Sequence, residues 1–292
     1  MKKANYRKII AARAYKLPDV WLDTHIPKMV NDLFKLIKFY YSQKTGSNNR
    51  SYFTLGMMVN NLRKNEEYKT TRIIDFMFNE SAKNLWSPNE PNINYYIDED
   101  LYNKEAQDIQ RLPRAEERSH NFYIAFYAVD DSSWWEKRFN GTFHRRGKTD
   151  EFVIDVNLPQ SAKLIDIVKD PQPYIDRIET TLKHELTHAH AQWSTGHDPS
   201  TQKGRDRFIR QTEDPDKYRN TQDEAMAWTQ NLTTKVKQWL RTADLSLPTN
   251  ELVRLFLDDL EASTDRTILN RVRDGHRKRY LQIIYNYIEE SK

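Results

Sequence analysis

Two histidines stand four residues apart within the segment from Thr181 to His190 (TLKHELTHAH), and Glu185 directly follows the first of them. His184, Glu185 and His188 thus form the pattern H-E-x-x-H. On a helix, residues four apart lie about 40° from each other around the axis, so both imidazole rings can converge on one ion. Glu185 lies on a neighbouring line of the same helix, from which it can reach a water beside that ion. The pattern therefore predicts a helix that carries two metal ligands and a base.

The sequence on either side of this pattern favours a helix from Pro173 to about Trp193. Apolar residues recur there at helical spacing and supply a stripe that can be buried: Tyr174, Ile175, Ile178, Leu182 and Leu186. Two histidines on an ordinary helix with no ion are the alternative interpretation.

The chain of 292 residues contains no cysteine, so a metal has to be bound by His, Asp or Glu. A catalytic zinc site uses three protein ligands and keeps a fourth position open for water. The best third ligand is Glu224, which starts a predicted helix 36 residues after His188. Ala225 and Ala227 would let that helix pack closely against the histidine-bearing helix. An ordinary first-turn acid, favoured by the helix dipole, is the alternative for Glu224.

Other residues near the pattern are weaker candidates. His197 is the main rival third ligand, nine residues after His188, and Asp223 is a weaker substitute. His190 lies about 200° from His188 around the helix and is expected to point away from the metal. Tyr218 is the first candidate for a donor that stabilises the transition state, with a packed surface tyrosine as the alternative.

His184, Glu185 and His188, followed by an alanine-containing helix from Glu224, resemble the zincin metallopeptidases, specifically the thermolysin-like glutamate-zincin branch. The resemblance covers about residues 121–241. It implies an enzyme that hydrolyses peptide bonds, with zinc bound by His184, His188 and Glu224 and with Glu185 activating water. It also implies that the strand before the active helix, Phe152 to Leu158, forms the sheet edge that faces the substrate. An ordinary core strand is the alternative.

Two departures from the family pattern matter. The spacing from His188 to Glu224 is longer than in thermolysin. The triplet Gly196-His197-Asp198 is similar to the SprT-like proteases, in which a histidine after the helix is the third ligand. The extended form H-E-x-x-H-x-x-G-x-x-H is absent, because Ala191 and Ser194 occupy its Gly and His positions.

Hydrophobic periodicity and turn residues predict the remaining elements. Helices are expected in the first hundred residues around Ile26–Tyr40, Leu55–Leu62 and Ile73–Met77, followed by an irregular connection from Trp86 to about Ser119. Strands are expected at Asn121–Val129 and Phe152–Leu158, with a hairpin turn at the Asn-Gly pair in Phe139–His144. Further helices are expected at Leu164–Val168, Glu224–Arg241, Thr249–Glu261 and Asp265–Glu289.

These elements predict an α+β chain with a zincin-like catalytic domain of a small sheet and an active-site helix. We expect a mostly helical N-terminal region at 1–115, the catalytic core at 116–245, and C-terminal helices at 246–292 that pack on the core.

Composition excludes some classes of protein. Charged residues make up 30% of the chain, and no apolar run approaches the roughly 20 residues that span a bilayer. The N-terminus lacks the apolar core of a secretory signal, so we expect an intracellular protein without a membrane partner. The cysteine-free, Asn- and Lys-rich composition suggests a microbial or viral source. The net charge is only +4, and the basic cluster from Arg271 to Arg279 is expected to be a solvated helix face, with contact to nucleic acid as the alternative.

Three hypotheses about function remain at this point. The preferred one is an active zinc metallopeptidase with a polypeptide substrate. The second is a SprT-like protease that acts on nucleic-acid-bound proteins. The third is a structural or assembly protein that keeps a zincin fold with little turnover, against which the retained Glu185 argues, because a purely structural metal site needs no base.

Overall fold

The computed structural model describes residues 17–43, 50–62, 72–78, 95–96, 122–130, 140–146, 151–195, 222–262, 269, 272 and 274–292. The chain divides into two units: Pro18–Leu186, and Thr187–Lys292 together with Met1–Leu17. The division falls inside one continuous helix, so the last turns of that helix belong to the second unit.

The first unit contains a mixed five-stranded sheet. Its strands are β1 (Arg72–Phe78), β2 (Tyr95–Tyr96), β3 (Phe122–Val129), β4 (Asn140–Arg146) and β5 (Glu151–Pro159). The strand order is β2-β1-β3-β5-β4. β3 and β5 run parallel, with Phe122 beside Phe152 and Val129 beside Pro159, and the other neighbouring pairs are antiparallel.

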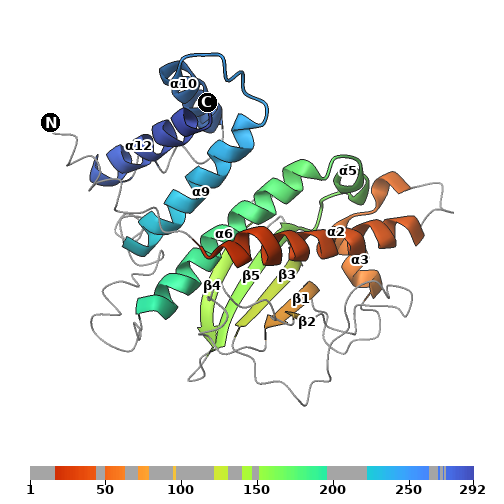
Figure 1. Ribbon diagram of the computed structural model, residues 1–292. Coiled ribbons are helices and arrows are strands. Elements are labelled where there is room, and N and C mark those ends of the chain that lie inside the picture. The colour runs from red at the N-terminus through yellow and green to blue at the C-terminus, as the bar shows by residue number, and fades with distance from the viewer. Residues whose placement is uncertain are drawn as a thin grey trace. The chain divides into compact units, whose positions relative to one another are not determined.

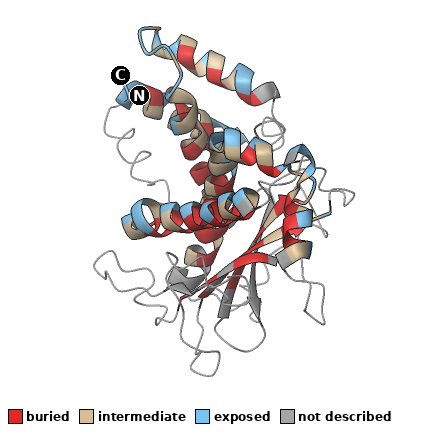
Figure 2. Cartoon of the chain, turned by 90° about the vertical axis from the view of Figure 1, so that its right-hand side faces the viewer, coloured by how far each residue is buried: buried red, intermediate tan, exposed pale blue. Residues whose placement is uncertain are grey.

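Alternate residues of the three central strands form the core face of this sheet. They are nearly all aromatic or β-branched, at most 1% exposed, and comprise Ile74, Phe76 and Phe78 of β1, Phe122, Ile124 and Phe126 of β3, and Ile154, Val156 and Leu158 of β5. The strand registers place Ile124 between Phe76 and Ile154. Figure 2 shows the buried residues in red along the described strands. Burial of these side chains explains why these short segments form a sheet.

The described helices of the first unit include α2 (Ile26–Gln43), α3 (Leu55–Leu62), α5 (Leu164–Lys169) and the first part of α6 (Gln172–Thr195). α2 follows a single π-helical turn, η1 (Trp21–His25), and α3 follows the short 3-10 helix η2 (Arg50–Tyr52). In Figure 1, α2 and the first part of α6 both lie across the same side of the sheet. The apolar positions predicted for the helix over Ile26–Tyr40 are all buried.

Backbone hydrogen bonds tie α3 to the end of β5. The amide of Leu55 donates to the carbonyl of Ala162 at 2.9 Å, and the amide of Gly56 donates to that of Gln160 at 2.9 Å. The amide of Gln160 in turn donates to the carbonyl of Val129 at 2.8 Å, at the end of β3. The chain therefore leaves the sheet at a well-anchored point before it enters α5 and α6.

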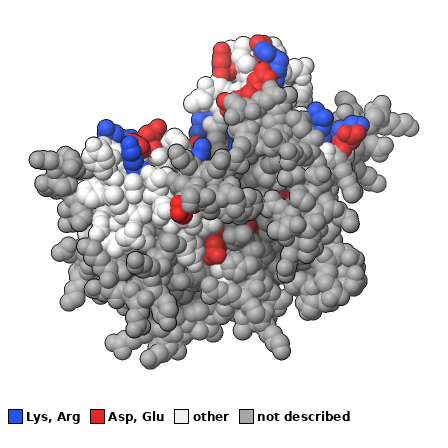
Figure 3. Space-filling model, turned by 180° about the vertical axis from the view of Figure 1, so that it is seen from behind, with Lys and Arg blue, Asp and Glu red and all other residues white. Residues whose placement is uncertain are grey.

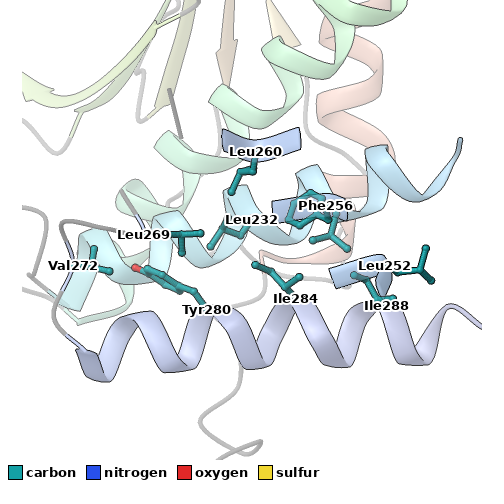
Figure 4. Close-up of a cluster of buried hydrophobic side chains, with 10 residues drawn as sticks. Leu232, Leu252, Phe256, Leu260, Leu269, Val272, Tyr280, Ile284 and Ile288 are labelled. Atoms are coloured by element: carbon teal, nitrogen blue, oxygen red, sulfur yellow. The ribbon is translucent and has the colours of Figure 1, made fainter. Parts of the chain in front are cut away.

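The second unit contains α9 (Gln222–Leu240), α10 (Thr249–Ala262) and α12 (Asp274–Glu290), besides the end of α6. These three helices and two residues between α10 and α12 share a core of buried side chains: Leu232, Val236, Leu252, Phe256, Leu260, Leu269, Val272, Tyr280, Ile284 and Ile288. Figure 4 shows this cluster. Tyr280, Ile284 and Ile288 recur at helical spacing along α12, and each is 0% exposed.

Most of the predicted elements are confirmed. The class is α+β, and the predicted helices over Leu55–Leu62, Leu164–Val168, Pro173–Trp193, Glu224–Arg241 and Thr249–Glu261 are present, as are the strands at Asn121–Val129 and Phe152–Leu158. The last helix begins at Asp274 rather than near Asp265. The Trp86–Ser119 segment, expected to be irregular, contributes strand β2.

Three predictions are wrong. The segment Ile73–Met77 is a strand, β1, because a short apolar run fits either element and its pairing between β2 and β3 decides the outcome. The Asn140-Gly141 pair does not form a turn, because both residues lie within β4, where Asn140 is paired with Asn157. β5 is an inner strand between β3 and β4, so the expected edge strand is instead a core strand and β4 forms that edge of the sheet.

The sheet also spans the boundary expected near residue 115, since β1 and β2 precede it and β3, β4 and β5 follow it. The N-terminal segment is thus joined to the predicted core by direct strand pairing between β1 and β3.

We expect the helical core of the second unit to be sensitive to truncation of Phe256, which is 2% exposed and packs its ring against that of Trp239 at 5.6 Å between centroids. Phe256→Ala should lower the free energy of unfolding by about 3–5 kcal/mol, because it removes apolar contacts and leaves a cavity. Urea denaturation followed by circular dichroism measures the change. Leu245→Ala, at a residue that is 37% exposed, is the control and should have little effect; equal losses in the two variants would contradict the prediction.

A second prediction concerns acid stability and His25. This residue is 4% exposed, and its ring lies 5.1 Å from that of Trp21 and 5.8 Å from that of Phe78. Burial, assisted by the charge of Lys28, lowers the pKa of His25 from 6.5 to about 4. Between these two pH values the unfolded chain binds a proton that the folded chain does not, so stability is lost as the pH falls.

At pH 4 the loss attributable to His25 should reach about 3 kcal/mol. The measurement is the free energy of unfolding in urea at several pH values from 7 to 4, for the wild type and for His25→Phe, which cannot titrate. The wild-type curve should fall more steeply over this window, and parallel curves would show that His25 titrates normally.

Candidate metal centre

The H-E-x-x-H residues lie in the regular part of α6, as predicted. His184 is 9% exposed, Glu185 is 7% exposed, and the side chain of His188 is 13% exposed. Leu182, Leu186 and Ala189 are each 0% exposed and hold one side of the helix in apolar surroundings. The helix thus places all three polar side chains at positions with little access to water.

Glu224 lies in the first turn of α9 and is 4% exposed. Its Oε2 atom is 3.2 Å from Nε2 of His188, and both residues belong to the second unit. Two ligands of one tetrahedral zinc ion, with bonds of about 2.0–2.1 Å, are separated by roughly 3.3 Å. The His188–Glu224 distance therefore matches the spacing of two ligands on one ion.

His184 completes the group, one turn before His188 on the same continuous helix. One ligating atom from each of His184, His188 and Glu224 can be chosen such that all three lie within 4.8 Å of one another. Among the described residues, His184, His188 and Glu224 form the group of His, Asp and Glu side chains whose ligating atoms lie this close together. Two imidazoles and one carboxylate are a donor set that suits zinc, so the residues present fit that ion.

Glu185 is not a member of this group, although it is adjacent to His184 in sequence. Its position is about 100° from His184 around the helix, which separates its carboxylate from the ligand line. Glu185 is therefore next to a ligand in sequence without being one of the three ligands.

Two aromatic residues that were not predicted as site residues hold the start of α9. Nε1 of Trp228 donates a hydrogen bond to Oε1 of Glu224 at 2.7 Å. The hydroxyl of Tyr280, on α12, donates to the carbonyl of Ala225 at 3.2 Å. Burial and the nearby Glu224 carboxylate raise the pKa of Tyr280, so its hydroxyl keeps its proton and remains a donor. The i,i+4 spacing could have indicated Trp228, whereas Tyr280 is 55 residues from Ala225 and carries no sequence signal.

The structure says less about the other residues that the sequence analysis proposed for the site. Tyr218 and the rival ligand His197 lie outside the described residues, and the side chain of Asp223, in α9, does too. His190 is half-buried, is not part of the metal-ligating group, and has its pKa lowered to about 4 by burial. The lowered pKa keeps its imidazole neutral near pH 7.

The structure describes only part of the basic cluster from Arg271 to Arg279. Arg277 and Lys278 on α12 are exposed, while Arg271 and Arg273 lie outside the described residues. On the face shown in Figure 3, the described Lys and Arg side chains alternate with Asp and Glu rather than gather in one patch. Among the described helices, none combines the length and the apolar character that crossing a membrane requires.

The chain matches no protein-family model, no curated protein and no solved structure. Any functional assignment therefore depends on the geometry of this site.

We expect the purified protein to bind one zinc ion per chain, because three ligating atoms converge. His188→Ala and Glu224→Ala should each lose most of this zinc in elemental analysis after dialysis. His190→Ala, two residues from His188, is the matched control and should retain it, as should His197→Ala. Zinc retained in Glu224→Ala but lost in His197→Ala would overturn the ligand assignment.

Proposed function

We propose that this chain is a zinc-dependent metallopeptidase of the zincin type, with His184, His188 and Glu224 as ligands and Glu185 as the general base. The observation that carries the proposal is the approach of Glu224 to His188 across 36 residues of sequence, at 3.2 Å between Oε2 and Nε2. A pair of histidines on one helix is common and does not by itself indicate a metal site. A buried carboxylate at ligand distance from His188 adds a third ligand and supports a metal centre.

The number and type of ligands favour a catalytic site over a structural one. Structural zinc sites are usually closed by four protein ligands, whereas catalytic sites use three and leave one position for water or substrate. The group of described residues has three members, two His and one Glu. This is the ligand set of thermolysin and carboxypeptidase A.

A zinc ion held by these side chains would act as a Lewis acid toward the scissile carbonyl and would lower the pKa of water. Glu185 supplies the remaining acid–base chemistry. Its carboxylate accepts a proton from the attacking water and later donates that proton to the leaving amine. Because Glu185 is 7% exposed, little bulk water competes for this proton.

The sheet supports a polypeptide substrate. Among the described strands, β4 has β5 as its one neighbour, so the other side of β4 is the position at which a further strand would pair. An extended peptide can add there as a further strand and gain backbone hydrogen bonds with little dependence on its sequence. This assigns to β4 the role that the resemblance to zincins implied for Phe152–Leu158.

The test of the reaction class is Glu185→Gln. The variant should keep its zinc, since Glu185 is not a ligand, and should lose casein cleavage by about 10²–10⁴-fold, since an amide cannot accept the proton. Glu179→Gln is the matched control on the same helix, where the native carboxylate lies 3.6 Å from Nζ of Lys183; it should retain activity.

Wild-type cleavage by Glu185→Gln would refute the assigned base. A zinc-loaded wild type that cleaves no unstructured protein would refute the peptidase and favour the structural alternative.

A further inference from the structure

The two oxygens of the Glu224 carboxylate have different neighbours. Oε2 lies 3.2 Å from Nε2 of His188, on the side of the metal-ligating group. Oε1 accepts the indole N–H of Trp228 at 2.7 Å, from one turn further along α9. The carboxylate is therefore held between a proposed co-ligand and a hydrogen-bond donor.

We infer that Trp228 is a positioning residue that makes Glu224 a one-oxygen ligand, binding the metal through Oε2 alone. The inference rests on the proposed metal centre. A carboxylate that binds through both oxygens occupies two coordination positions and would close the position that a catalytic site leaves for water. The indole N–H engages Oε1 and prevents this change of binding mode.

A tryptophan is well suited to this task. Its Nε1–H is a donor only, so it can neither bind the metal nor accept a proton from its surroundings. Trp228 and Glu224 lie four residues apart on one helix, and the rigid indole ring fixes the direction of the bond. In a site as buried as this one, where Glu224 is 4% exposed, the hydrogen bond competes with little water.

The packing of α9 holds Trp228 in place. Trp228 packs against the helical core of the second unit. Next to Glu224, the carbonyl of Ala225 accepts hydrogen bonds from the hydroxyl of Thr229 at 2.9 Å and from Tyr280 at 3.2 Å. The first turn of α9 is thus tied to α12, which reduces the freedom of the carboxylate to rotate toward a different binding mode.

Trp228→Phe removes the N–H and keeps an aromatic ring. Loss of a hydrogen-bond partner of a metal ligand typically weakens metal binding by about 10–100-fold, and we expect a loss in that range. Competition with a chromophoric chelator measures the zinc affinity. With cobalt(II) as the probe, the visible absorption spectrum of the variant should differ from that of the wild type, because a second carboxylate oxygen takes the place of the water ligand.

Trp239→Phe is the matched control, since Trp239 lies on the same helix but packs against Phe256. It should keep the wild-type affinity and cobalt spectrum. Trp228→Gln, which restores an N–H donor on a side chain of similar reach, should recover part of both signals, and it serves as the decisive variant if Trp228→Phe is poorly folded by circular dichroism.

Wild-type zinc affinity and cobalt spectrum in both Trp228 variants would overturn the inference while leaving the metal centre intact. Absence of metal binding in the wild type would instead overturn the proposed function and this inference together.

Discussion

The contact between Glu224 and His188 is the constraint on which the candidate site depends. A carboxylate that is 4% exposed has lost most of its hydration, and this loss is costly unless the charge is compensated. The indole of Trp228 compensates one oxygen, and the other oxygen lies beside the His188 imidazole, where a divalent cation would compensate it most strongly. The burial of this carboxylate thus supports the proposed metal centre.

The elements that carry this site are helices rather than loops. His184, Glu185 and His188 occupy α6, while Glu224 and Trp228 occupy α9. Backbone hydrogen bonds within each helix set the relative positions of its side chains, and buried apolar residues on α6 and α9 hold the helices in place. Ligands on helices keep nearly the same relative positions before and after the metal binds, so such an arrangement suits a metal site.

The parts of the fold that could be predicted are those with a strong local pattern. The amphipathic stripe of α6 and the alternation in β5 each select one secondary structure, and both predictions are confirmed. The wrong predictions concern segments whose local sequence fits more than one secondary structure, or whose local preference is outweighed by strand pairing. The apolar run in β1 fits a helix or a strand equally well. The Asn140-Gly141 pair favours a turn, but it lies in β4 because it pairs with β5. The inner position of β5 depends on strand order, which a single strand's pattern does not encode.

The sequence alone was sufficient to identify the helix-borne pair His184 and His188 and the adjacent Glu185, because residue type and spacing along one helix determine which side chains share a face. It also indicated Glu224 as a candidate ligand, as a carboxylate at the start of a later predicted helix. Only the tertiary structure showed that Glu224 reaches His188, that Trp228 holds its other oxygen, and that Tyr280 anchors the turn between them. The contacts of Glu224 with His188 and of Tyr280 with Ala225 join segments 36 and 55 residues apart, and their formation depends on how apolar surfaces pack, which no local spacing specifies.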